Sequence, residues 1–320
     1  MAALSPSARG ASPKAGRPRG YIANYRPQAR TRALLEDVQA VLDEYREHWP
    51  LTARQIFYRC VGAHGYDKSE RFYSTLCHHL ANARRARLVP FDAIRDDGVT
   101  TFTMDHYADA DAFREKVRKQ AENYRRDLMA DQDIHAEIWC EAAGMTAQLS
   151  RVGDQYSIRA YSSSGFDSLT AKKMLADRIC ETGKPAFVLH LGDYDPSGKG
   201  IFDAAAEDVQ AFVRADRANA MVNVQFVRVA LTEQQVSAYR LPTSPPKVTD
   251  SRSKNWDGET CQLEALAPDQ IAALLKAEIE KIVDVRRMNE ALAAEQYERQ
   301  QLTRLLPAPV STTSRRNGDG

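Results

Sequence analysis

The feature that most constrains this chain is the run Leu191-Gly192-Asp193-Tyr194-Asp195-Pro196-Ser197-Gly198, which follows the apolar stretch 186–190. Such a stretch is typical of a buried strand, and Pro196 indicates that a helix begins just after the acidic residues. Ligands of an open α/β sheet bind at the carboxyl ends of its strands. Two carboxylates two residues apart point the same way in an extended chain and repel each other unless a cation lies between them. The run therefore predicts a site for Mg²⁺, which binds one or two carboxylates, waters and substrate phosphates.

A third carboxylate is expected at the same edge of the sheet. Glu141 directly follows the apolar segment 134–140, and parallel strands share their carboxyl ends. Glu141, Asp193 and Asp195 are therefore the candidate metal ligands. The alternative is that Asp195 only caps and opens a helix. That alternative explains Asp195 but not the three carboxylates together.

The region around these acids alternates between strand and helix patterns. Such alternation is typical of a mostly parallel sheet with helices on its faces. The segment 241–257 is irregular, and helical periodicity returns over 268–300. Strands are expected at 134–140, 156–161, 186–191 and 222–230, and helices near 142–151, 168–181, 199–214 and 232–239.

The first third of the chain has a different pattern. Helices are predicted over 30–48, from Thr52 as N-cap to Val61, and from Ser69 to Arg85, followed by short β-like pieces at 88–91 and 99–102. Three helices followed by a hairpin are the order of a winged helix. The third helix is then expected to carry Arg84, Arg85 and Arg87 toward DNA. The alternative is that they are a solvated, basic helix end.

Charge is distributed unevenly along the chain. Residues 1–100 carry 16 Lys and Arg against 10 Asp and Glu, whereas the whole chain has a net charge of +1. This asymmetry favours a DNA-facing half and an acidic, metal-binding half. Residues 1–20 have no acids and too little apolar surface to fold. Within them, Arg17 and Arg19 flank a proline in a Gly-Arg-Pro-Arg-Gly motif like an AT-hook, which places arginines in a narrow minor groove; otherwise it is a solvated tail.

Other sequence features restrict the cellular setting. No apolar run approaches the roughly 20 residues that span a membrane, and the N-terminus has no apolar secretory region. The five cysteines are dispersed without C-x-x-C spacing, which predicts reduced thiols and a cytoplasmic protein. These cysteines are Cys60, Cys77, Cys140, Cys180 and Cys261.

The acidic set resembles that of a Toprim domain: Glu141 closes one strand and the Asp193-x-Asp195-Pro-x-Gly run follows another. Upstream, Arg54-Gln55-Ile56-Phe57-Tyr58-Arg59 resembles the motif of the A subunit of topoisomerase VI and of its relative, the meiotic double-strand-break transesterase. Ser164-Gly165-Phe166-Asp167 is similar to the glycine turn of that family. The resemblance covers roughly residues 30–240, with both halves in the order of the family.

The resemblance implies a DNA-cleaving transesterase of the type IIB topoisomerase kind. Tyr58 is then the nucleophile that forms a 5′-phosphotyrosyl end, assisted by Mg²⁺ (or Mn²⁺) on the Toprim carboxylates. In this family the tyrosine of one subunit meets the metal site of the other, so a homodimer on double-stranded DNA is implied. The chain has no G-x-x-x-x-G-K-[ST] motif, so strand passage would need a separate ATPase subunit.

The residues themselves support a role for Tyr58 and leave alternatives. A phenol has a pKa near 10 and needs help to act as a nucleophile. Arg54 lies four residues earlier, on the same helix face, and is suited to hold a phosphate or favour the phenolate. Lys199 is a further candidate phosphate contact, or a solvated residue. Alternatively, Tyr58 is a core aromatic residue and the chain is a Toprim nuclease that uses water, or a DNA-binding protein without catalysis.

The expected fold is thus α/β, with an α+β winged-helix domain and a Toprim-type, mostly parallel sheet flanked by helices. We expect six regions: a basic tail (1–29), a winged helix with the candidate nucleophile (30–104), a helical connector (105–132), a Toprim domain (133–240), an irregular segment with C-terminal helices (241–306) and a second tail (307–320).

Overall fold

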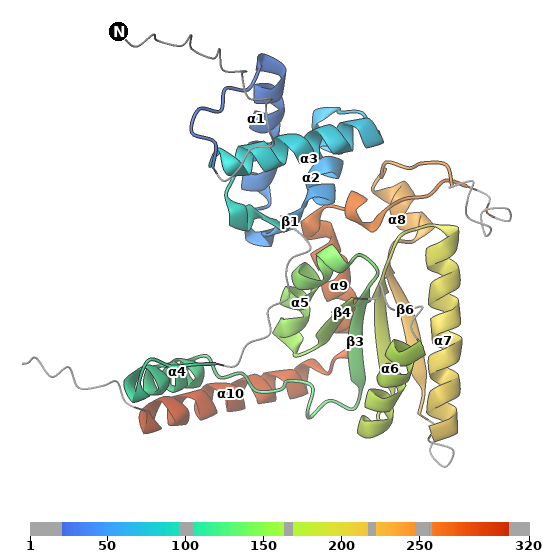
Figure 1. Cartoon of the computed structure of the whole chain (residues 1–320). Helices are drawn as coiled ribbons and strands as arrows, with labels where there is room; N and C mark the ends of the chain where they lie inside the picture. The colour runs from blue at the N-terminus through green and yellow to red at the C-terminus, as the bar shows by residue number, and fades with distance from the viewer. Residues whose placement is uncertain are drawn as a thin grey trace, which may run out of the picture. The chain divides into compact units, whose positions relative to one another are not determined.

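The computed structural model describes residues 21–95, 105–162, 169–216, 222–246, 256 and 258–306. The chain divides into two compact units, Met1–Ile94 and Arg95–Gly320 (Figure 1). Four predicted features lie outside the described residues: the basic tail 1–20, the second hairpin piece 99–102, the glycine turn 164–167 and the tail 307–320. Within the described ranges, no helix is both long enough and apolar enough to cross a membrane.

The N-terminal unit contains three α-helices, α1 (Ala29–Glu44), α2 (Ala53–His64) and α3 (Glu70–Arg85). Two short strands, β1 (Leu51–Thr52) and β2 (Ile94–Arg95), form a small sheet. The Thr52 side chain accepts from the backbone N–H of Gln55 at 3.1 Å, while the Gln55 side chain accepts from the N–H of Thr52 at 2.8 Å. This capping box fixes the start of α2, as predicted. The three helices are confirmed, and the winged helix stays a prediction.

The core of this unit forms where the apolar faces of the three helices meet. Val38, Val41 and Leu42 of α1 are fully buried. Their spacing of three or four residues places them on one helix face, which is the reason that α1 buries this side. Other fully buried residues of this unit are Leu51, Ile56, Cys60, Leu76, Ala83 and Ala93.

The C-terminal unit is built on a four-stranded parallel sheet, which confirms the predicted α/β class. Its strands are β3 (His135–Cys140), β4 (Arg159–Ser162), β5 (Ala186–Leu191) and β6 (Val224–Ala230). Their order in the sheet is β4-β3-β5-β6, and every neighbouring pair is parallel. The central strands β3 and β5 are almost wholly buried, because helices cover both of their faces.

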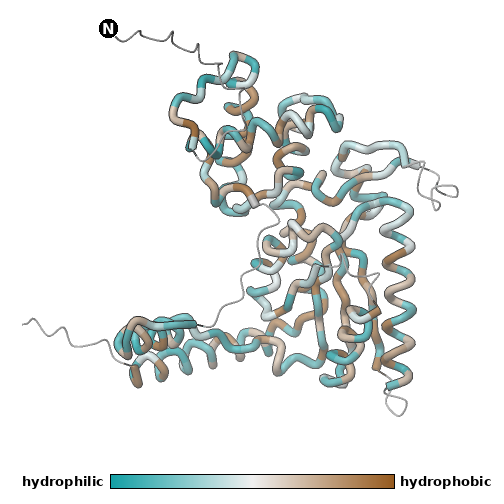
Figure 2. The backbone as a smooth tube through the Cα atoms, viewed as in Figure 1, coloured by the Kyte–Doolittle hydropathy of each residue, from teal (hydrophilic) through white to brown (hydrophobic). Residues whose placement is uncertain are grey.

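Helices lie on both faces of this sheet. In Figure 1, α6 (Leu169–Thr182) and α7 (Pro196–Asp216) lie on one side, and α5 (Thr146–Gly153) and α9 (Pro268–Ile282) on the other. Apolar residues from α6, α7 and the strands make a common core on the first side. Figure 2 shows apolar residues running along the strands, with more hydrophilic residues on the outer helix faces. A short α8 (Glu233–Ala238) follows β6.

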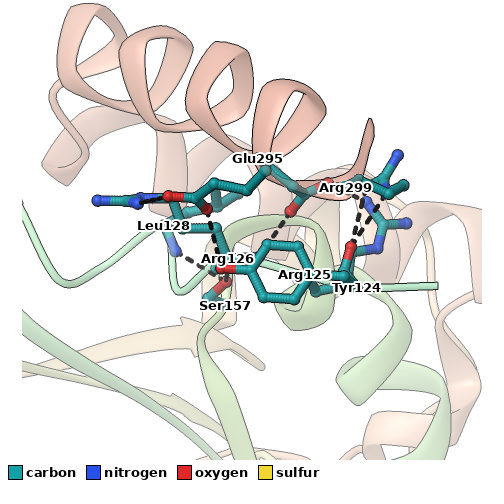
Figure 3. Close-up of polar contacts among 8 residues, drawn as sticks. Tyr124, Arg125, Arg126, Leu128, Ser157, Glu295 and Arg299 are labelled. Carbon is teal, nitrogen blue, oxygen red and sulfur yellow. Dashed lines mark hydrogen bonds and ion pairs between the residues drawn. The ribbon is translucent and has the colours of Figure 1, made fainter. Parts of the chain in front are cut away.

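Two further helices of this unit pack against each other, α4 (Ala110–Glu122) in the predicted connector and α10 (Val285–Leu305) near the C-terminus (Figure 1). The segment after α4 is held by Glu295 of α10, whose side chain is only 4% exposed. The Glu295 carboxylate accepts from the backbone N–H of Arg126 at 2.9 Å and from Nη1 of Arg125 at 3.3 Å, and it also pairs with Arg299 (Figure 3). Glu298 of the same helix also accepts from the Tyr124 hydroxyl at 2.9 Å and from Nη1 of Arg126 at 2.6 Å, so two carboxylates fasten this segment to the last helix.

A buried ion pair secures β3 to α6. Glu137 is 2% exposed, and its two oxygens accept from Nε and Nη2 of Arg178 at 2.7 and 2.8 Å. His135 and the indole N–H of Trp139 complete the carboxylate's contacts at 2.9 Å each. Burial works against the charged form, but the hydrogen bonds from Arg178 and His135 outweigh it and lower the pKa of Glu137. The carboxylate is therefore ionised and fully engaged, so it serves the fold.

Candidate active site

The three predicted carboxylates meet at the carboxyl edge of the sheet. Cys140 and Leu191, the last residues of β3 and β5, are register partners. Glu141 follows the first of these strands directly, and Asp193 and Asp195 follow the second. The backbone N–H of Asp193 donates to Oε2 of Glu141 at 3.3 Å. Neighbouring parallel strands that end in register are thus the reason that these acids lie together.

Backbone N–H groups orient the two aspartates. Oδ1 of Asp193 accepts from the N–H of Leu263 at 2.8 Å, and Oδ1 of Asp195 accepts from the N–H of Gly198 at 2.6 Å. Tyr194, between them, exchanges two backbone hydrogen bonds with Cys261, at 2.8 and 2.9 Å. A carboxylate has two oxygens and several lone pairs, so one N–H bond does not use its full capacity. The segment around 261–263, which sequence reasoning did not connect to the site, therefore shapes it.

The carboxylates also interact electrostatically. The pKa of Glu141 is raised to about 7, first by burial and then by the charges of Asp193 and Asp195, with a partly opposing effect of Arg228. Three carboxylates in a partly buried place repel one another, and a proton on Glu141 relieves that repulsion. A cation would relieve it equally well.

Two glycines keep the backbone close to the acids. A Cβ atom on Gly192 would lie 2.5 Å from Oε2 of Glu141, and one on Gly198 would lie 2.8 Å from the carbonyl oxygen of Asp193 and 3.2 Å from Oε2 of Glu141. The shortest contact at each glycine, 2.5 Å at Gly192 and 2.8 Å at Gly198, is closer than a Cβ atom can approach another heavy atom. A residue with a Cβ atom at either position would therefore displace the acidic residues. The site depends on the absence of side chains at these two positions.

Sequence reasoning missed Arg228, which lies in β6 beside the acids. Its Nε donates to the carbonyl oxygen of Leu231 at 2.8 Å, and its Nη2 donates to the carbonyl oxygen of Asp193. Its Nη1 is buried and has no hydrogen-bond partner in the part of the chain that the structure describes. The pKa of the neighbouring His190 is lowered to about 3 by burial and by Arg228, so this imidazole is neutral at pH 7. An arginine within the apolar run 224–231 was the signal available in the sequence.

The donor atoms of this site are carboxylate oxygens, which suit a hard metal ion such as Mg²⁺. Among the described residues, no three His, Cys, Asp or Glu side chains are arranged as a ready-made metal cluster. Mg²⁺, however, keeps several of its waters and binds through one or two carboxylates and substrate phosphates, so it does not need such a cage. The hard oxygen donors, their mutual repulsion and the open backbone at the glycines fit this ion.

Tyr58, the predicted nucleophile, belongs to α2 in the N-terminal unit and is only 2% exposed. Its ring packs edge-on against Phe57, with centroids 5.1 Å apart, and Nζ of Lys68 lies 5.8 Å from the ring centroid. The Arg54 guanidinium lies over the ring of Tyr73, 5.2 Å from its centroid. The burial of Tyr58 fits the alternative in which it is a core aromatic residue.

Two of the predicted DNA-contacting arginines of the N-terminal unit make contacts within it. The guanidinium of Arg84 lies 4.7 Å from the ring centroid of Phe91 and donates to the carbonyl oxygen of Phe91 at 3.3 Å. Arg87 lies 4.3 Å from the ring centroid of Tyr21. These side chains thus help to pack the segments that flank α3. Arg85 is the last residue of α3.

The remaining candidates are separately placed. Lys199 is exposed in the first turn of α7, and its backbone N–H donates to the carbonyl oxygen of Asp195 at 3.2 Å. Arg17 and Arg19 lie outside the described residues.

Comparison with known proteins does not assign this site. No family model matches the chain, and neither does any curated protein in a sequence search. The function is therefore inferred from the sequence motifs and from the geometry of the carboxylate site.

Proposed function

We propose that this chain is a metal-dependent DNA-cleaving transesterase. The observation that supports the proposal best is the meeting of Glu141, Asp193 and Asp195 at the carboxyl ends of β3 and β5, with the pKa of Glu141 raised to about 7. Carboxylates held in mutual repulsion at this edge are typical of metal sites that act on phosphates. The fold class and the order of the two motifs agree with a Toprim-type enzyme.

In this proposal, Glu141, Asp193 and Asp195 would hold Mg²⁺ or Mn²⁺ between them, one or two of them as direct ligands and the rest through its waters. The bound metal would neutralise charge on the scissile phosphate and position the leaving 3′-oxygen. Arg228 and the Leu263 N–H hold Asp193 in place through its backbone carbonyl and its carboxylate, respectively. Lys199 would contact a neighbouring phosphate from the start of α7.

The proposed nucleophile is Tyr58. The phenol gives up its proton, and its oxygen forms a bond to phosphorus as the bond from phosphorus to the 3′-oxygen breaks, which leaves a 5′-phosphotyrosyl end. The 3′-oxygen takes up a proton and becomes a hydroxyl, so no proton is gained or lost overall. Because Tyr58 is 2% exposed, its hydroxyl must become accessible when DNA binds. By its resemblance to the family, the active form is a homodimer on double-stranded DNA, with a separate ATPase subunit if strands are passed, in the cytoplasm.

A second candidate, a nuclease in which water attacks, is favoured by the burial of Tyr58. In that case the carboxylate site is unchanged, Tyr58 is a core residue of α2, and no protein becomes attached to DNA. A protein that binds DNA without cutting it is the third outcome that the experiment must separate.

Covalent trapping distinguishes these candidates. Supercoiled plasmid is incubated with the protein and Mg²⁺ or Mn²⁺, stopped with SDS and analysed with and without proteinase K. The variants are Tyr58→Phe and Asp193→Asn, with controls Tyr73→Phe, whose ring also packs against Phe57, and Glu207→Gln on α7. Protein-linked ends lost in both test variants but kept in both controls support the transesterase.

Other outcomes contradict it. Cleavage that survives Tyr58→Phe without protein attachment, and that is lost in Asp193→Asn, identifies the nuclease. Salt-sensitive DNA binding without any cleavage identifies a binding protein.

A further inference from the structure

The N-terminal unit contains a cavity that the proposed catalytic residues do not use. Its volume is about 450 Å³, within the range of pockets that hold small ligands. Residues of α1, of α3 and of the loop before α3 line it. They include Arg30, Thr31, Tyr66, Ser69, Arg71 and Phe72.

Two arginines give the cavity a positive charge. Arg30 of α1 and Arg71 of α3 are both exposed, and neither has an ion-pair partner among the residues that the structure describes. Asp67 also lines the cavity, and it offsets one of the two charges. The pKa of His79, a further lining residue, is lowered by burial and by His78, so its imidazole is neutral at pH 7. Among the described residues, Arg30 and Arg71 therefore remain as charged groups of the lining to which no carboxylate is bound.

Two aromatic rings, those of Tyr66 and Phe72, also line the cavity. Tyr66 and Phe72 stack with their ring planes 6° apart and their centroids at 4.8 Å. The Tyr66 hydroxyl donates to Oδ2 of Asp37 at 2.7 Å, and Nδ1 of His64 lies 3.0 Å from the other oxygen of that carboxylate. Asp37 is thus engaged by these two groups and anchors the aromatic wall.

The lining also offers hydroxyl groups. Ser69 Oγ accepts from the backbone N–H of Phe72 at 3.2 Å, which leaves its own proton to donate. Thr31 of α1 contributes a second hydroxyl. Two guanidinium groups with hydroxyl donors are the set that binds phosphate oxygens, because a guanidinium forms two parallel hydrogen bonds to such a group.

We propose that this cavity binds a nucleotide phosphate, with Arg30 and Arg71 as its charged ligands and Tyr66 and Phe72 as the wall against the sugar or base. A nucleotide phosphate can belong to a DNA strand or to a free nucleotide. Binding of a DNA strand rests on the proposed function, and binding of a free nucleotide does not. Arg84 and Arg87 are two of the arginines predicted to contact DNA. In the structure, Arg84 lies against the ring of Phe91 and Arg87 lies against the ring of Tyr21. Arg30 and Arg71 are exposed cations of this unit that also line a cavity.

The test is binding measured in EDTA, where metal-dependent cleavage cannot contribute. Fluorescence anisotropy is recorded with a labelled 20-base-pair duplex and, separately, with fluorescent AMP and ATP analogues. Arg30→Ala and Arg71→Ala are compared with Arg32→Ala, which removes the same charge from α1 at an exposed position outside the cavity. Because all three side chains are exposed, circular dichroism should show unchanged folding.

For a DNA strand as ligand, each cavity variant should weaken duplex binding about tenfold and reduce the slope of log K against log salt by about one, the change expected from one lost phosphate contact. Arg32→Ala should change the affinity less than twofold. Loss of nucleotide binding alone identifies a free nucleotide as the ligand.

The inference is overturned if neither probe binds the wild-type chain, or if Arg32→Ala weakens binding as much as the cavity variants do. Its failure is distinguishable from failure of the proposed function, because cleavage depends on Asp193 in the presence of metal. Cleavage with unaltered binding by the cavity variants would reject the cavity and retain the enzyme.

Discussion

Oε2 of Glu141 accepts a hydrogen bond from the backbone N–H of Asp193 at 3.3 Å, across 52 residues of sequence. This contact joins the ends of β3 and β5 and brings a carboxylate against the loop that carries two others. Burial first, and then the charges of Asp193 and Asp195, raise the pKa of Glu141 to about 7 and outweigh the lowering by this hydrogen bond. A group that titrates near neutral pH therefore lies at the centre of the proposed site.

The Glu141 carboxyl should make the metal-free protein less stable as pH rises. Its folded-state pKa of about 7 lies above its ordinary value of 4.5, so its stabilising effect is present at low pH and is lost as pH rises through 7. In EDTA, we expect the Tm of the wild type to fall by about 5 °C more than that of Glu141→Gln between pH 5.5 and 8. Adding Mg²⁺ at pH 8 should raise the wild-type Tm. Identical pH profiles for the two proteins would contradict this account.

Gly192→Ala should disrupt the site through a steric clash with Glu141. The added Cβ would lie 2.5 Å from Oε2 of Glu141 and 2.7 Å from Cε1 of His190, so Glu141 must move away from the Asp193 N–H. We expect about 1–3 kcal/mol lower stability in urea denaturation and at least about tenfold slower plasmid cleavage. Gly62→Ala in α2, where no atom lies within 4 Å, is the control and should stabilise its unit by about 0.5–1 kcal/mol. Equal effects of the two variants would reject the steric argument.

Arg178→Met should destabilise the sheet unit strongly. Removing this guanidinium takes two hydrogen bonds from Glu137, which is 2% exposed, and leaves its charge with only His135 and the Trp139 indole N–H. The expected loss in free energy of unfolding is about 3–5 kcal/mol. Lys173→Met on the same helix breaks only exposed pairs with Asp177 and Asp216 and should have little effect. Chemical denaturation of both variants checks this, and a small loss for Arg178→Met would show that the pair is dispensable.

Glu295→Gln should loosen the connection between the segment 124–128 and α10. The neutral amide weakens the hydrogen bonds from Arg125, Arg126 and Arg299, which are charge-assisted or made to a charged acceptor (Figure 3). Hydrogen exchange of the Arg126 amide should accelerate by about tenfold or more, since bonds to charged groups contribute about 1.5–3 kcal/mol. Glu290→Gln on the same helix, which breaks an exposed pair with Arg286, serves as the control. Unchanged exchange in Glu295→Gln would contradict the anchoring role.

Much of the fold was readable from local patterns. Apolar stretches with helical segments between them predicted the parallel sheet, because a strand buried on both faces must be apolar throughout. Thr52 as N-cap marked the start of α2. The structure adds the reciprocal bond from the Gln55 side chain, which completes a capping box. Asp193 and Asp195 after β5, and Glu141 after β3, followed from the shared direction of parallel strands.

Only the tertiary structure revealed the hydrogen-bond partners that come from distant parts of the chain. Arg228 and Leu263 reach Asp193 through hydrogen bonds that no local spacing encodes. The packing of the helices likewise decides that Tyr58 is buried and that Arg30 and Arg71 line the same cavity. Local sequence determines strand direction and helix ends, because those depend on neighbouring residues. The burial of a residue, its desolvation and the charged groups that lie near it depend on segments that only folding brings together.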